Sequence, residues 1–205
     1  MRFVWILVAV AALQAAPRII YKKSFPGSVP EFVQITLEPS GDAVYQEAPD
    51  DDRPVKFKLP EAETKQIFEL AAKLDHFKRP LESGLKVARM GDKTFRWEDG
   101  EAAQEVTFNY TQDLDGQAIQ AWFEKISETE QHLFALERAV RFDKLGANRV
   151  LLILQTAMDK NRLVATEQFL PWLDRIAKNE SFLNMARERA AGIAAQIRAP
   201  KPGAE

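Results

Sequence analysis

The stretch GSVPEFVQITLEPSGDAVYQE, residues 27–47, is the part of the chain that decides the fold class. Apolar and polar residues alternate over residues 32–37, stop at Ser40-Gly41-Asp42, and alternate again over residues 43–47. A period of two residues is typical of a strand with one buried face, and Ser-Gly-Asp favours a turn. The stretch therefore predicts a β-hairpin, and we expect a binding edge to be its use.

Further strands are predicted on both sides of this hairpin. A short strand is expected in residues 17–23, and the alternation recurs in residues 54–59, 93–97 and 105–110. Between them, residues 60–76 have apolar side chains three and four positions apart, which indicates a helix that begins near Pro60. We expect an α+β domain over residues 17–126, with a small, mostly antiparallel sheet and one packed helix.

The remainder of the chain has helical periodicity. A short helix over residues 117–126 is expected to pack on the sheet, because Trp122 and Phe123 need a surface to bury against. Ser127-Glu128-Thr129-Glu130 resembles a capping box, which predicts that a new helix begins at Ser127. We expect an all-helical bundle over residues 127–198 and a disordered tail over residues 199–205.

Two segments of the helical part are similar to each other. Residues 129–140 read TEQHLFALERAV and residues 166–177 read TEQFLPWLDRIA, 37 positions further along. That spacing is in the range of helix-pair repeats, so two helical hairpins, 128–160 and 166–198, are one interpretation. Chance similarity between two amphipathic helices is the other.

The segment VLLILQTAM, residues 150–158, is apolar on nearly every side of a helix. A helix of this kind lies at the centre of a bundle or at a subunit interface. We favour the bundle centre, and a homodimer through residues 150–158 is the alternative.

The N-terminal sequence predicts export. Residues 1–15 have an early Arg, an apolar run from Phe3 to Leu13 and then small residues, which is the layout of a secretory signal peptide. The run is shorter than the about 20 residues that a membrane span needs, so no transmembrane anchor is expected after cleavage. The chain has no Cys, so no disulfide stabilises it. We expect a periplasmic or secreted protein.

The start of the hairpin also resembles a family of uncharacterised bacterial exported domains. In that family a Gly-x-Cys-Pro-x-aromatic start leads into a strand, a Gly turn and a strand that ends in Tyr. The corresponding residues here are Gly27, Pro30, Phe32, Gly41 and Tyr45, whereas Val29 stands where the family has Cys. The resemblance covers residues up to about Ile126 and implies the fold and export only.

Sequence motifs for chemistry are absent. The chain has two His, His76 and His132, without a second His at metal-ligand spacing. Asp113-Leu114-Asp115-Gly116 would place Thr111 and Trp122 at the end positions of a calcium loop, so a strand-to-helix turn is the better interpretation. We therefore predict no catalytic residue, no cofactor and no metal site.

These observations favour a non-catalytic binding module. Tyr45, Trp97 and Tyr110, together with Phe108, are candidates for an aromatic binding surface on one face of the sheet, and burial in the core is the alternative. The net charge of −2 argues against nucleic acid as a partner, so we expect a protein or an envelope component. An inhibitor of a secreted enzyme, acting through residues 97–100, is a second hypothesis. A hydrolase that uses paired carboxylates is a third.

Overall fold

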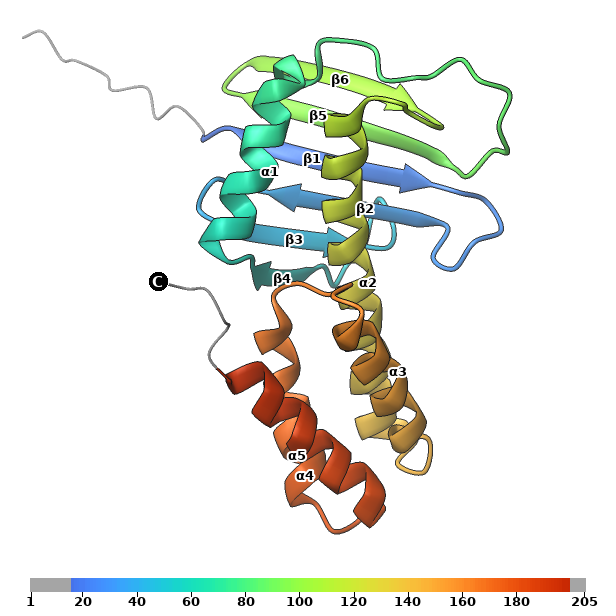
Figure 1. Ribbon diagram of the computed structural model, residues 1–205, viewed down its shortest axis with the longest axis vertical. Helices are drawn as coiled ribbons and strands as arrows, with labels where there is room; N and C mark the ends of the chain where they lie inside the picture. Colours follow the sequence, from blue (N-terminus) through green and yellow to red (C-terminus); the bar gives the residue numbers. More distant parts are fainter. Residues whose placement is uncertain (1–15, 200–205) are drawn as a thin grey trace, which may run out of the picture.

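The computed structural model describes residues 16–199, which form a sheet unit followed by a helical unit (Figure 1). Six strands make one antiparallel sheet in the order β4-β3-β2-β1-β5-β6. The predicted fold class, α+β with a helical C-terminal part, is confirmed. The elements are β1 (Arg18–Ser24), β2 (Phe32–Leu37), β3 (Asp42–Gln46), β4 (Val55–Lys58), α1 (Glu61–Lys73), η1 (Asp75–Phe77), β5 (Asp92–Asp99), β6 (Ala102–Phe108), α2 (Leu114–Phe142), α3 (Ala147–Asp159), η2 (Thr166–Phe169), α4 (Leu170–Lys178) and α5 (Asn184–Arg198).

The hairpin predicted from residues 27–47 is formed by β2 and β3, but it is not an edge of the sheet. β2 lies between β1 and β3, and β3 lies between β2 and β4. The expectation that it serves as a binding edge was therefore wrong. Local alternation predicts the hairpin, but it does not predict which strands pair with it on either side. The edge strands are β4 and β6.

Gly41 shapes the turn of this hairpin. Its φ is +86°, and a side-chain Cβ at this position would lie 2.5 Å from the carbonyl oxygen of Leu59. The backbone needs this approach, because Leu59 N donates a hydrogen bond to Gly41 O at 2.8 Å. The turn thus connects β3 to the chain that enters α1.

Gly41→Ala is expected to destabilise the protein by roughly 1–3 kcal/mol or more, because strain in the left-handed region adds to the clash with Leu59. Urea unfolding would measure the loss. Gly100→Ala is the matched control, since Gly100 also has a positive φ, +60°, but its Cβ would meet nothing within 4 Å. Equal losses of unfolding free energy at the two positions would show that the close approach of Gly41 to Leu59 does not contribute to stability.

One face of the sheet is covered by helices and the other is polar. Figure 1 shows α1 and the first half of α2 lying side by side across the same face. The core between sheet and helices includes Ile19, Ile35 and Phe95 from the strands, with Ile119 and Phe123 from α2. On the opposite face, polar side chains pair across strands, as Gln34 does with Gln46. The period-two alternation of the strands follows from this one-sided burial.

α2 is a single helix of 29 residues, which corrects the predicted helix start at Ser127. Ser127 lies in the middle of α2, and the expected helix over residues 117–126 is its first part. Thr129 and Glu130, which a capping box would expose, are buried at 0% and 1% exposure. The actual N-cap is Asp113, whose side chain accepts a hydrogen bond from Gly116 N. The predicted packing of residues 117–126 on the sheet is confirmed by Ile119, Phe123 and Ile126.

The helical unit has its own core, which α2 shares. Leu133 and Leu136 of α2 belong to it, whereas Ile126, two turns earlier, belongs to the core beneath the sheet. The link between α3 and η2 joins the units, because Val164 N donates a hydrogen bond to the buried Thr129 hydroxyl at 3.0 Å. The similar segments 129–140 and 166–177 lie in α2 and in η2–α4, and their common origin stays a prediction.

α3 does not lie at the centre of a bundle, which corrects the expectation for residues 150–158. Leu151 and Leu154 are fully buried, but Leu152 and Ile153 are 49% and 50% exposed. α3 packs on α2 and α5 with one face, and no other helix of residues 16–199 covers the opposite face. A homodimer through this helix stays a prediction. Within residues 16–199 no helix has both the length and the apolar content of a membrane span.

Leu154→Ala is expected to lower the free energy of unfolding by about 2–5 kcal/mol, because it opens a cavity in the second core. Leu152→Ala removes the same atoms from a side chain that is half exposed on the outer face of α3. It should lower the free energy of unfolding much less. Both losses can be measured by urea unfolding. Similar losses for the two variants would mean that the outer face of α3 is also covered.

Candidate functional site

A groove runs along one side of α2, over the part of the sheet that the helices leave uncovered. It consists of two cavities of about 420 and 590 Å³ that share Lys23 and Glu124. The first cavity lies between the N-terminal half of α2 and the loop that precedes β5. The start of β5 and residues 109–111 also line it. The second continues along α2 to Ala135 and is closed by Ile153 of α3 and by Arg162, which follows α3. We call the two together the α2 groove.

The loop over residues 80–91 forms the outer wall of the first cavity, and Asn109 holds it in place. The Asn109 side chain accepts a hydrogen bond from Met90 N at 2.8 Å and donates one to Ala88 O at 3.2 Å. Its backbone N–H donates to Glu82 Oε2 at 2.6 Å, and this bond is the main reason why the pKa of Glu82 is lowered. Val87 and Met90 on this wall remain 43% and 58% exposed.

Two lysines form the floor of the first cavity. Lys23 on β1 and Lys93 on β5 are directly opposite each other in the antiparallel register, on the face of the sheet that carries the helices. Lys93 is 4% exposed, and its Nζ donates to Asn109 O at 2.7 Å. Burial lowers the pKa of Lys93, and the neighbouring Lys23 lowers it further. Like charges in this position oppose pairing of the strands, so the arrangement is unusual for a structural one.

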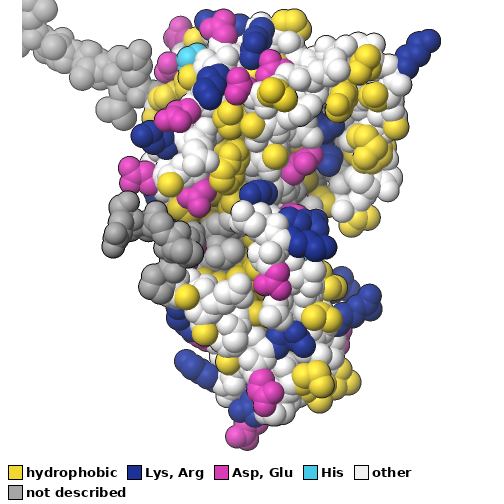
Figure 2. All heavy atoms as spheres, viewed as in Figure 1, with side chains coloured by type: hydrophobic (Ala, Val, Ile, Leu, Met, Phe, Trp, Pro, Cys, Tyr) yellow, Lys and Arg dark blue, Asp and Glu magenta, His cyan; other side chains and the backbone are white. Residues whose placement is uncertain are grey.

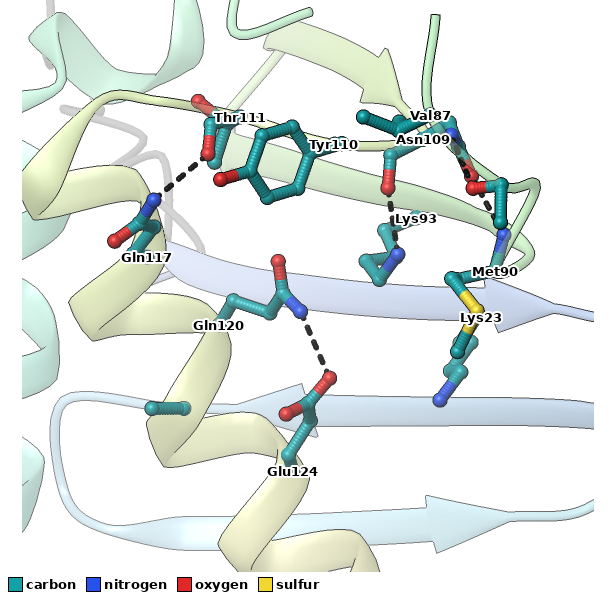
Figure 3. A pocket seen from close by; sticks show the side chains of 12 residues that line it. Lys23, Val87, Met90, Lys93, Asn109, Tyr110, Thr111, Gln117, Gln120 and Glu124 are labelled. Atoms are coloured by element: carbon teal, nitrogen blue, oxygen red, sulfur yellow. Dashed lines mark hydrogen bonds between the residues drawn. The ribbon is translucent and has the colours of Figure 1, made fainter. Parts of the chain in front are cut away.

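The opposite wall is a polar stripe of α2. Gln117, Gln120 and Glu124 follow one another at helical spacing, and Figure 3 shows Gln120 and Glu124 across the cavity from the lysines, with Gln117 turned to Thr111. Gln120 Nε2 donates to Glu124 Oε1 at 2.8 Å, and Gln117 Nε2 donates to Thr111 O at 2.9 Å. Amide, carboxylate and ammonium groups therefore converge on a space that also has an apolar wall.

The second cavity holds a buried hydroxyl and an ionic cluster. The Tyr21 hydroxyl is enclosed and has no hydrogen-bond partner among residues 16–199. Burial raises the pKa of Tyr21, so the phenol stays protonated and can donate. Glu128 pairs with Arg162 at 2.6 Å and lies 3.5 Å from His132, whose pKa is lowered by burial.

The aromatic residues that the sequence suggested as a binding surface do not lie together. Tyr45 is fully buried, with its ring 6.0 Å from that of Phe134, and cannot present a surface. Trp97 is covered by His76 and Phe68 beside α1, with ring centroids 4.3 and 5.8 Å away. Tyr110 is 40% exposed and lines the α2 groove. Of the predicted residues, Tyr110 is therefore the one that belongs to the candidate site.

Phe108 lies in the core at 2% exposure, as the alternative interpretation expected. The Asp113–Gly116 segment forms the strand-to-helix turn that was preferred over a calcium loop. His76 and His132 lie on different elements, one against Trp97 and the other beside Glu128. Among residues 16–199 no three His, Cys, Asp or Glu side chains are grouped as metal ligands.

Lys23, Lys93 and Asn109 were not predicted from the sequence as residues of a site. A signal for the lysines was present, since Lys23 continues the inward positions of Ile19 and Tyr21 in β1, and Lys93 shares the inward face of Phe95. Their position opposite each other depends on the pairing of β1 with β5, about 70 residues apart in sequence, which local periodicity does not give. Asn109 carried no signal, because its partners lie in a loop.

Comparison with known proteins gives no family. The chain matches no protein-family model, and the search of curated proteins returned no relative. The resemblance to exported domains with a Gly-x-Cys-Pro-x-aromatic start thus stays a prediction. The α2 groove has to be interpreted from its own chemistry.

Glu130 is a buried acid close to the groove but not part of it. It lies on α2 between the two cores, where Gln168 Nε2 donates to its Oε1 at 3.0 Å and its Oε2 has no partner among the described residues. Burial raises the pKa of Glu130 to about 7, and the bond from Gln168 offsets part of this effect. The folded protein therefore holds a proton that the unfolded chain has lost between about pH 4.5 and pH 7.

The protein is expected to lose stability as the pH rises through this range, because ionised Glu130 is penalised only in the folded state. Glu130→Gln should remove this dependence and raise the free energy of unfolding at pH 8.5 by up to about 3 kcal/mol, with little change at pH 4.5. Urea unfolding at both pH values would measure it. Glu180→Gln, at an exposed position, is the control. A loss of stability in Glu130→Gln at pH 8.5 would contradict the expectation.

Proposed function

We propose that the protein is an exported, non-catalytic binding module that holds a segment of a protein partner in the α2 groove. The observation that carries the proposal is the composition of the first cavity. It combines an exposed apolar wall, Val87, Met90 and Tyr110, with a floor of one buried and one partly exposed lysine and a polar helix stripe. Exposed apolar side chains beside convergent polar groups are typical of binding sites.

The shape of the groove favours a polypeptide segment. The two cavities have volumes typical of ligand sites and follow α2 from Gln117 to Ala135. The second cavity is lined mainly by groups that hydrogen-bond, among them Ser127, Gln131 and Arg162. A peptide backbone would use these donors and acceptors, whereas an acyl chain of an envelope lipid would find few apolar contacts there.

The wall of the groove is also suited to holding a partner without rearrangement. Loop 80–91 is fixed to the link after β6 at several points, including Ser83 N to Tyr110 O at 2.9 Å. A surface that is ordered before binding loses less conformational entropy on association. The inhibitor hypothesis relied on residues 97–100, but Trp97 is covered by side chains of α1 and η1. No observation supports this hypothesis as the groove supports a binding module.

The proposal can be tested by site-specific photo-crosslinking in the cells that export the protein. A photoreactive phenylalanine analogue would replace Tyr110 or Gln120 in the groove, and Thr107 or Gln34 on the opposite face of the sheet. We expect crosslinks to a protein from the groove positions only. Met90→Asp, which places a charge on the apolar wall, should reduce the crosslinking from Gln120.

Three results would contradict the proposal. Crosslinks from Thr107 or Gln34 without any from the groove would place the binding surface elsewhere. Enzymatic turnover that a single Asp→Asn or Glu→Gln change abolishes, for example at Glu124, would make the protein a hydrolase instead. Crosslinks from the groove to an envelope component that is not a protein would contradict the choice of partner.

A further inference from the structure

The cross-strand pair of Lys23 and Lys93 has no directly bound counter-ion in the part of the chain that the structure describes. Neither lysine forms an ion pair within 4 Å with a carboxylate of residues 16–199, whereas Arg89 in the neighbouring loop is paired with Asp92. Lys93 is bound by backbone carbonyl groups, Asn109 O at 2.7 Å and Gly91 O at 3.4 Å, and its Nζ lies 5.9 Å from the Phe108 ring centre. These contacts hold the ammonium but do not neutralise it.

The acids around the pair do not cancel its charge. Among residues 16–199, Glu124 is the one carboxylate that lines the cavity, and it is held by Gln120 on the opposite wall. Glu82 and Asp92 also act on Lys93, but Glu82 accepts backbone hydrogen bonds from Asn109 and Gly84 outside the cavity, and Asp92 is paired with Arg89. The groups that face the cavity therefore carry one net positive charge, from two lysines and one glutamate.

Uncharged donors and apolar side chains surround this charge. Figure 3 shows Lys23, Lys93 and Met90 gathered at one side of the cavity, with Tyr110 and the α2 stripe around the remaining space. In the adjoining cavity the Tyr21 hydroxyl, two residues before Lys23 on the same face of β1, is buried without a partner. A ligand that bridges the two cavities would meet an ammonium pair, a phenol donor and an apolar wall.

We propose that the α2 groove binds a carboxylate of the partner polypeptide at Lys23 and Lys93, with an adjacent apolar side chain packed on Val87, Met90 and Tyr110. This inference rests on the proposed function and adds to it the chemistry of the bound segment. The carboxylate comes from an Asp or Glu side chain or from a chain terminus. Its binding supplies the counter-ion that the lysine pair lacks and lets Lys93 remain charged while buried.

The single net charge selects a carboxylate over a phosphate. A phosphate group carries close to two negative charges at neutral pH and would be repelled by Glu124, which lies on the facing wall. A carboxylate matches the net charge and needs only two or three donors. The apolar wall gives no stabilisation to an isolated inorganic anion. The site therefore favours a segment with a carboxylate for the lysines and an apolar side chain for the wall.

The test uses four small probes and the amide NMR spectrum of the full chain. N-acetyl-leucine presents a terminal carboxylate beside an apolar side chain, and N-acetylglutamic acid α-amide presents a side-chain carboxylate. N-acetyl-leucinamide is the neutral match of the first probe, and inorganic phosphate is the competing anion. We expect N-acetyl-leucine to bind roughly tenfold more tightly than its amide, with saturable shifts at Gly91, Lys93 and Asn109.

Matched variants locate the effect. Lys23→Met should weaken binding of the carboxylate probes severalfold and leave N-acetyl-leucinamide unchanged. Lys22→Met is the control, because Lys22 is the neighbouring residue of the same strand and faces the other side of the sheet. Lys93→Met should act as Lys23→Met does. If thermal unfolding shows that the Lys93→Met variant does not fold, the comparison of Lys23→Met with Lys22→Met is the test.

The outcomes separate this inference from the proposed function. Equal binding of N-acetyl-leucine and its amide, or no saturable shifts with any probe, would overturn the carboxylate site, while crosslinks from the groove would still support the binding module. Tighter binding of phosphate than of both carboxylates would also overturn it. Carboxylate binding that depends on Lys23 would support the site even if no protein crosslinks to the groove. Which carboxylate probe binds more tightly tells whether a terminus or a side chain is preferred.

Discussion

The position of α2 is the constraint on which the rest of the structure depends. Its first half must bury Ile119, Phe123 and Ile126 against the sheet, and its second half must bury Leu133 and Leu136 in the helical core. A rotation or shift that improved one contact would expose apolar side chains in the other. α2 therefore crosses the sheet in one place, beside α1, and the ends of β1 and β5 beyond it stay uncovered (Figure 1). The α2 groove is what remains of the helix-covered face, which is why its floor has inward-facing residues.

This origin explains how charged residues come to occupy the inward side of a sheet. Positions 23 and 93 continue the inward alternation of Tyr21 and Phe95, but they lie past the reach of α2, where a cavity replaces helix packing. Lys23 can reach solvent, whereas Lys93 is enclosed by loop 80–91 and its Asn109 anchor. The loop that makes the apolar wall is thus the same element that desolvates Lys93. Polar and apolar parts of the site are linked by one set of backbone contacts.

Much of the fold could be predicted from the sequence, because its signals are local. Alternation in residues 32–37 reflects burial of one face, and the 3–4 stripe of residues 60–76 reflects the contact of α1 with the sheet. The errors arose where a local signal competes with tertiary burial. Ser127 and Glu130 have the spacing of a capping box, yet Glu130 faces Gln168 between the cores and the helix continues through both. Likewise the apolar stretch around Ile153 suggested burial on all sides, but four helices leave its outer face uncovered.

The site was largely beyond sequence reasoning, because it is made of non-local pairings. Only Tyr110 was named in advance, and its partners depend on strand order and on the loop that Asn109 holds.

The buried polar atoms without a hydrogen-bond partner also differ between the site and the rest of the fold. Glu130 Oε2 and Gln104 Oε1 also lack partners among the described residues, but neither residue lines the groove. Glu130 can relieve its cost by taking up a proton, as its raised pKa indicates. The Tyr21 hydroxyl keeps its proton and finds no acceptor among residues 16–199, and the Lys93 ammonium is held by backbone carbonyl groups without an ion-pair partner among them. Their remaining hydrogen-bonding capacity points into the α2 groove, where a bound segment can use it.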